Sequence, residues 1–317
     1  MRVLVTGAGG FVGSRIVSRF AAAGHTVTAA ARSLHALFSV STVTLDLLDP
    51  ASITAAFVAA RPDAVVHAAA LADLGKCESN LQLANRVNAD GTALIADRCR
   101  EHGARLIYLS TDQVFDGAAP WRRETDDTNP VQVYGQTKLN GEQAVLAEAV
   151  VAPNAAFCIA RLALVYGLAP PGSPKLSAVE QILAAASAGE TARLFTDEYR
   201  TPIHADDVAA ACELLALLPA ERLPPIIHVA GPDRLSRWEL GQLIAERWRL
   251  DTSLLEPALQ ADLKVGLPRA KDVSLDTSIL RGLMSPAPRS IKEGLDAVHR
   301  EWVASQPRGQ TGSARTS

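Results

Sequence analysis

Two residues of complementary chemistry, Tyr134 and Lys138, lie four positions apart in the segment Val-Tyr-Gly-Gln-Thr-Lys-Leu. The segment reads as a helix, on which this spacing places both side chains on one face. A phenol has a pKa of about 10, and a neighbouring ammonium group stabilises its phenolate form. Of the four tyrosines, only Tyr134 has a lysine at this spacing. The pair predicts an acid–base group that exchanges a proton with a substrate oxygen. The alternative is a buried tyrosine and a surface lysine on an ordinary helix, without a catalytic role.

A polar loop, Ser110-Thr111-Asp112-Gln113, follows an apolar run over 105–109 that predicts a buried strand. Ligands of parallel sheets bind outside the carboxyl ends of the strands. We expect the Thr111 hydroxyl, and less directly that of Ser110, to hydrogen-bond the same substrate oxygen and polarise it. Asp112 and Gln113 are candidate substrate-binding residues.

A glycine turn near the start of the chain joins an apolar run over 3–6 to a segment of helical periodicity. The glycines at intervals of three suit a sharp turn, a close approach of a pyrophosphate to the backbone, and close packing of helix on strand. The helix N-terminus then faces the phosphates. An ordinary tight loop is the alternative. The predicted dinucleotide-binding residues of this turn are Gly7, Gly10, Phe11, Val12 and Gly13.

The end of the second predicted strand indicates which dinucleotide binds. Sites for NAD place an acidic residue about 20 positions past the turn, whereas Arg32 follows two alanines here. A cation suits the 2′-phosphate of NADP(H); the alternative is a solvated loop charge, with NAD(H) as the cofactor. We expect Asp46 to meet the adenine. The other expected cofactor contacts come from the ends of the following strands and from the catalytic helix: Leu47, Ala68, Ala69, Ala70, Tyr134 and Lys138.

Strands and helices alternate through the first half of the chain, which predicts an α/β fold with a doubly wound parallel sheet. The expected strands cover 25–31, 42–45, 64–70, 105–109 and 157–162 after the first, with helices over 14–23, 50–60, 81–102 and 134–149. One of Asn85 and Asn88 is expected to bond backbone or water beneath the site. The predicted domains are a dinucleotide-binding domain over 1–162, to which parts of the later chain return, a smaller C-terminal substrate-binding cap over 163–304, and a disordered tail over 305–317.

Composition narrows the function. A formal net charge of -3 on 317 residues provides no basic surface for nucleic acid or for a membrane, so we expect a small-molecule substrate. The four cysteines lack metal-ligand spacing, as do the seven histidines, which predicts buried or neutral thiols and no metal. With no signal segment and no long apolar run, the chain is predicted to be cytoplasmic.

These motifs resemble the extended short-chain dehydrogenases/reductases, which carry the glycine turn, the Ser-Thr loop and Tyr-x-x-x-Lys in this order. The segments over 110–117 and 133–142 are similar to the dTDP-4-dehydrorhamnose reductase family, as are those over 200–204 and 269–276. The resemblance covers nearly the whole chain and implies a Rossmann fold, a cap around Arg200 that holds the substrate's nucleotide or sugar, and a homodimer formed through the helices over 81–102 and 134–149. Gln113 departs from the family, which usually has tyrosine there.

Three functions are compatible with the resemblance. The first is an NADP(H)-dependent reductase of a nucleotide-linked keto-deoxysugar, in which Tyr134 donates the proton. The second is an epimerase or dehydratase on the same scaffold; related dehydratases carry an acid pair after the threonine, whereas the second position here is Gln113, which cannot accept a proton at neutral pH. The third is a non-catalytic NADP-binding regulator, since the family also resembles the beta subunit of methionine adenosyltransferase.

Overall fold

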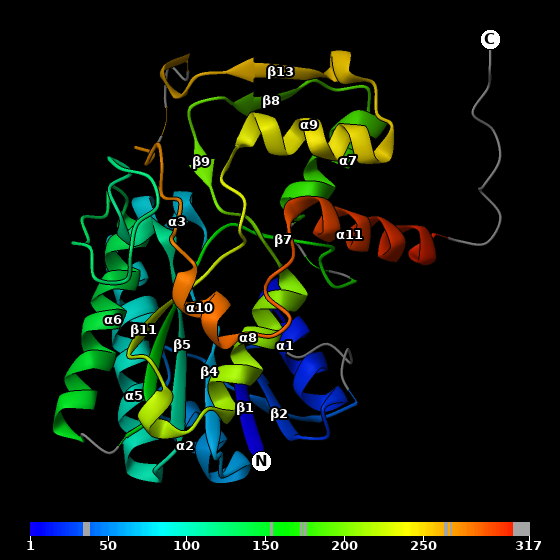
Figure 1. Cartoon of the computed structure of the whole chain (residues 1–317). Helices are drawn as coiled ribbons and strands as arrows, with labels where there is room; N and C mark the ends of the chain where they lie inside the picture. Colours follow the sequence, from blue (N-terminus) through cyan, green and yellow to red (C-terminus); the bar gives the residue numbers. More distant parts are fainter. Residues whose placement is uncertain are drawn as a thin grey trace.

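A parallel sheet of seven strands forms the centre of the computed structural model, which describes residues 1–33, 39–152, 155–171, 173, 176–262, 266 and 268–306. The strand order is β11-β6-β5-β4-β1-β2-β3, and every pairing is parallel (Figure 1). The predicted fold class is therefore confirmed. The strands are β1 (Arg2–Thr6), β2 (Thr26–Ala31), β3 (Ser41–Thr44), β4 (Ala64–His67), β5 (Arg105–Thr111), β6 (Phe157–Leu162) and β11 (Ile226–Val229).

Helices cover both faces of this sheet, which is why its inner strands are apolar on both sides. One face is covered by α1 (Phe11–Ala22) and α8 (Ala205–Leu217), and the other by α2 (Pro50–Ala60), α5 (Gly91–His102) and α6 (Val133–Val151). Each face has its own buried core. The strand order reverses between β1 and β4, and such a reversal opens a crevice for ligands at the carboxyl ends of the strands.

Two elements differ from the sequence prediction in ways that shape this crevice. The strand predicted over 64–70 ends at His67, so the alanines after it are loop residues at the crevice. The helix predicted over 81–102 is divided into α4 (Leu81–Asn85), a π-helical turn over Arg86–Asp90, and α5. Asn88 lies in that turn and bonds both the N–H and the carbonyl of Leu71, at 2.7 and 3.1 Å, which confirms the expected bond to backbone.

A smaller layer of mixed elements lies beyond the carboxyl ends of the strands (Figure 1). It is built around a third core, contributed mainly by α7, α9 and α11. Its elements include α7 (Ala178–Ser187), β8 (Ala192–Phe195), β9 (Tyr199–Arg200), α9 (Arg237–Trp248), β13 (Leu255–Ala258) and α11 (Ile291–Ser305). The later elements α8 and β11 belong to the layers of the main sheet. The domain boundary at 162 stays a prediction.

Helix α11 was not anticipated by the apolar pattern, although its start carries a sequence signal. Ser290 and Glu293 form a capping box, in which each side chain bonds the backbone of the other. The helix ends at Ser305, where the disordered tail was predicted to begin. Residues 307–317 of that tail lie outside the described residues.

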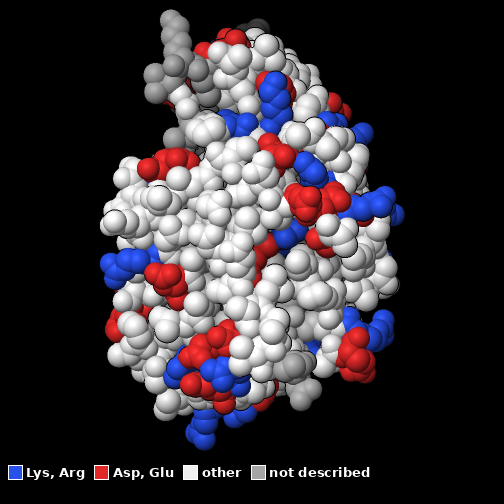
Figure 2. Space-filling view, turned by 90° about the vertical axis from the view of Figure 1, so that its left-hand side faces the viewer, with Lys and Arg blue, Asp and Glu red and all other residues white. Residues whose placement is uncertain are grey.

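The surface shows no large area of one charge on the face drawn in Figure 2, where acidic and basic side chains are interspersed. All four cysteines are buried, as predicted. No helix within the described ranges is long and apolar enough to span a membrane.

Candidate active site

The glycine turn after β1 has the geometry that a pyrophosphate site requires. Gly7 has a φ of +66°, and a Cβ there would lie 2.6 Å from the backbone nitrogen of Ala69. A Cβ on Gly13 would lie 2.2 Å from the Gly7 carbonyl oxygen, so α1 packs directly on the turn. Helix α1 begins at Phe11 with Gly10 as its N-cap, without a side-chain cap or an acidic residue in its first turn. Its first N–H groups are therefore available to an anion.

A cavity of about 450 Å³ opens beside this turn. Eight of the predicted cofactor residues line it together: Gly7, Gly10, Arg32, Asp46, Leu47, Ala68, Ala69 and Ala70. The other predicted cofactor residues are not in its lining: Phe11, Val12, Gly13, Tyr134 and Lys138. Phe11 instead lies against Gly167. The cradle of backbone, the uncapped helix start and the cavity fit a dinucleotide.

Tyr134 lies at the start of α6 beside the end of β5, and it is half-buried. Burial and the Asp112 carboxylate raise the pKa of Tyr134 above its ordinary value, while a hydrogen bond with Thr111 opposes them. We expected Lys138 to lower this pKa, but burial and the Asp112 carboxylate raise it instead, so the phenol stays protonated at neutral pH. A neutral phenol is the form that donates a proton.

Lys138 is buried, with 2% of its surface exposed, one turn along α6 from Tyr134. Its Nζ lies 4.0 Å from the centre of the Tyr108 ring, which stacks in turn on His67. Burial lowers the pKa of Lys138 to about 7, against the opposing effect of the Glu142 carboxylate. The same ammonium group and burial lower the pKa of His67 to about 3. Lys138 therefore titrates near neutral pH.

Ser110 does not join Thr111 at the phenol. Its hydroxyl donates to Glu142 Oε1 at 2.5 Å, and Arg161 donates to both oxygens of the same carboxylate, at 2.8 Å for the shortest bond. All three side chains are buried. Neighbouring residues of a strand point to opposite sides. Ser110 therefore points toward Glu142 and links β5 to α6, whereas Thr111, the last residue of β5, points to the other side.

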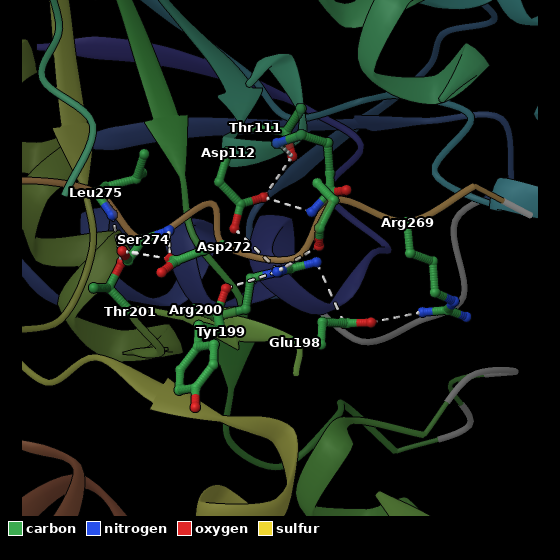
Figure 3. A network of polar contacts seen from close by, with 12 residues as sticks. Thr111, Asp112, Glu198, Tyr199, Arg200, Thr201, Arg269, Asp272, Ser274 and Leu275 are labelled. Atoms are coloured by element: carbon green, nitrogen blue, oxygen red, sulfur yellow. Dashed lines mark hydrogen bonds and ion pairs between the residues drawn. The ribbon is translucent and has the colours of Figure 1, made fainter. Parts of the chain in front are cut away.

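Figure 3 shows how the Thr111 loop is connected to the smaller layer of mixed elements beyond the carboxyl ends of the strands, which is called the upper layer below. The Asp112 carboxylate is buried; its Oδ1 accepts hydrogen bonds from Thr111 and from the Gln113 amide, at 3.2 and 3.1 Å. Its Oδ2 lies 3.8 Å from Arg200 Nε. Burial raises the pKa of Asp112, and Arg200 opposes that shift.

Arg200 is also buried, and its guanidinium donates to the carbonyls of Tyr199 and Ala270 at 2.7 and 3.3 Å. Its Nη2 lies 3.3 Å from Glu198. The guanidinium of Arg200 therefore contacts groups of the protein itself: two carboxylates and two backbone carbonyls. It joins the loop at Thr111 to the upper layer.

Several residues of the site were not anticipated from the sequence: Tyr108, His67, Glu142 and Arg161. Tyr108 lies two positions before Ser110 on the same side of β5, and this period of two was the available signal. Gly141 is glycine because a Cβ there would lie 2.4 Å from the Tyr108 hydroxyl. Among the residues that the structure describes, no group of three or more His, Cys, Asp or Glu side chains could hold a metal ion.

Residues 1–303 match the family model described as "RmlD substrate binding domain". The chain is 32% identical to the probable low-salt glycan biosynthesis reductase Agl14 of Haloferax volcanii over 94% of this chain and 97% of that protein. It is 31% identical to methionine adenosyltransferase 2 subunit beta of Bos taurus, over 93% and 87%. The structure of dTDP-4-dehydrorhamnose reductase from Bacillus anthracis in complex with NADP superposes with a TM-score of 0.80 at 23% identity, covering 95% and 99%. The chain therefore belongs to the RmlD substrate-binding domain family, with the extended short-chain dehydrogenase/reductase fold.

Proposed function

We propose that the protein is an NADP(H)-dependent reductase of a nucleotide-linked keto-deoxysugar. The observation that carries this proposal is the placement of the Tyr134 phenol beside Thr111, at the carboxyl end of β5, in a fold that has a cavity for a dinucleotide at the adjoining strand ends. The reductase named among the relatives supports the same reaction class.

The proposed step needs one proton donor and one group that polarises the substrate carbonyl. Bound NADPH would supply a hydride to the carbonyl carbon. Tyr134 donates its phenolic proton to the carbonyl oxygen, and the Thr111 hydroxyl bonds that oxygen as negative charge develops on it. Lys138, Tyr134 and the glycine turn hold the cofactor. Because Gln113 is an amide, the loop lacks the second acid of a dehydratase.

A regulatory role is the second candidate, because the beta subunit of methionine adenosyltransferase 2 is a relative over most of both chains. One experiment separates the candidates. Purified protein is mixed with NADPH and a panel of nucleotide 4-keto-6-deoxysugars, and the nicotinamide absorbance is followed. A reductase consumes NADPH with at least one sugar. Recovery of a stoichiometric enzyme partner without turnover would favour the regulator, and loss of water from a nucleotide hexose, seen by mass spectrometry, would favour a dehydratase.

Arg32 is proposed to select NADP(H) over NAD(H). It lies on the surface of the cavity after β2, at the position where an acidic residue would bond a free ribose. Arg32→Asp is expected to reverse the cofactor preference and to weaken NADPH binding by about 1.5–3 kcal/mol, because one charge-assisted contact to phosphate is lost. Titration of both proteins with NADPH and NADH measures this. Equal affinity of the parent for the two cofactors would contradict the assignment.

A homodimer through α5 and α6 is the proposed assembly. Three apolar side chains near the end of α6 are exposed, Leu146 at 37%, Val150 at 80% and Val151 at 69%. Pairing of two copies about a two-fold axis would cover them. Light scattering at micromolar concentration is expected to give twice the chain mass of 33.5 kDa. The mass of a single chain would rule the dimer out.

A further inference from the structure

Glu198 is the centre of a group of arginines in the upper layer. Its carboxylate is buried, and each of its oxygens already has a guanidinium partner: Arg200 Nη2 lies 3.3 Å from Oε1, and Arg269 Nη1 lies 3.2 Å from Oε2. Figure 3 shows this chain of contacts running from Asp112 through Arg200 and Glu198 to Arg269. Glu198 therefore already pairs with two guanidinium groups.

A third guanidinium, that of Arg237, belongs to the same group. Arg237 is the first residue of α9, and its backbone N–H donates to the Glu198 carbonyl at 3.0 Å. Within the described part of the chain, its half-buried side chain has no hydrogen bond and no carboxylate within 4 Å. The undescribed residues contain no Asp or Glu. In the described ranges, no acidic side chain therefore forms an ion pair with Arg237, and Glu198 acts on it only from a greater distance.

Charge is unbalanced around Arg237. Among the described residues, Arg200 and Arg269 form ion pairs with the carboxylates of Glu198 and Asp112, whereas Arg237 forms none. Burial and the two neighbouring arginines lower the pKa of Arg237 from its ordinary value, and the Glu198 carboxylate opposes this shift. A partly desolvated cation without a partner is unfavourable, and an anion bound beside it would restore the balance.

We propose that Arg237, together with the donors of Arg269 that Glu198 does not use, binds an anionic oxygen group of the substrate, either a diphosphate or a sugar carboxylate. This inference rests on the proposed function, because it takes the anion to be part of the reductase's substrate. Arg200 then acts as a positioning residue for Asp112, in place of the substrate contact expected from the sequence.

Binding of simple anions tests the inference without turnover. The probes are dTDP and UDP for a diphosphate and glucuronate for a carboxylate, and calorimetry measures their binding to the parent, to Arg237→Gln and to Arg247→Gln. Arg247 is the matched control, since it lies near the other end of α9 and pairs with Asp296. We expect Arg237→Gln to weaken binding of whichever probe the parent binds about 10- to 100-fold, as for one charge-assisted hydrogen bond. Arg247→Gln should bind like the parent.

Two further readouts keep the inference falsifiable. NADPH affinity should be unchanged in Arg237→Gln, and its thermal midpoint without ligand should equal or exceed that of the parent, because an unpaired charge has been removed. A lowered midpoint would show Arg237 to be a structural counter-ion of Glu198 and would overturn the inference, as would a parent that binds none of the probes. If the anion binds through Arg237 but no keto-sugar is reduced, the inference stands and the proposed function fails.

Discussion

Replacing Tyr134 by phenylalanine is expected to lower turnover by about 10²–10⁴ while NADPH binding survives, because the ring is kept and only the proton is lost. Burial and Asp112 keep this phenol protonated at neutral pH, so the parent holds the donated proton throughout the neutral range. The Thr111 hydroxyl alone polarises the carbonyl without replacing that proton. The loss should therefore appear in kcat more than in KM.

The matched control for this substitution is Tyr166→Phe. Tyr166 is fully buried and its hydroxyl has no hydrogen-bond partner within the described structure, so its removal should leave turnover unchanged. Single-turnover loss of NADPH absorbance measures the effect, and fluorescence titration measures NADPH affinity. Unchanged turnover in Tyr134→Phe would remove the catalytic assignment and favour the regulatory candidate.

The sheet was predictable because each strand corresponds to an apolar run of the sequence that is bounded by turn residues. The run over 105–109, which precedes the polar loop, is an example. The glycine turn was predictable from its local spacing. Gly13 packs against the Gly7 carbonyl six residues earlier, whereas Gly7 packs against Ala69, just after the end of β4. Local pattern also placed the helix over 50–60, which are the observed bounds of α2.

The partners of the polar residues were not predictable, because they come from elements far apart in the chain. Asp112 meets Arg200 across 88 positions, as the two residue numbers show. A sequence motif marks Arg200 as a polar residue near the site, but only the packed upper layer shows that its donors are used by protein groups. Conversely, nothing in the local sequence distinguishes Arg237. Its proposed role follows from the ion pairs that Arg200 and Arg269 form with the carboxylates nearby.

Replacing Lys138 by methionine is expected to reduce kcat/KM by about 10²-fold or more and to change how stability depends on pH. The ammonium group, which is proposed to hold the cofactor, is lost while the apolar stem is kept. In the parent, kcat/KM should fall as pH rises through about 7, the pKa of Lys138, since the cationic form is lost. Methionine removes a buried charge, so the variant should be more stable at pH 6 by about 1–3 kcal/mol, reduced by the lost contact with the Tyr108 ring.

The pH dependence of the stability difference between Lys138→Met and the parent tests whether the buried charge causes it. The folded chain holds Lys138 at a pKa of about 7, whereas a lysine in an unfolded chain has a pKa of about 10.4. Between these values the unfolded parent binds more protons than the folded parent, so its free energy of unfolding rises with pH relative to the variant. The advantage of Lys138→Met should be largest below pH 7 and shrink toward pH 10, as measured by urea unfolding of both proteins across this range. Groups shared by the two proteins cancel in the comparison. A difference independent of pH would show that Lys138 is not a buried cation, and a variant as active as the parent would show that the reaction does not use it.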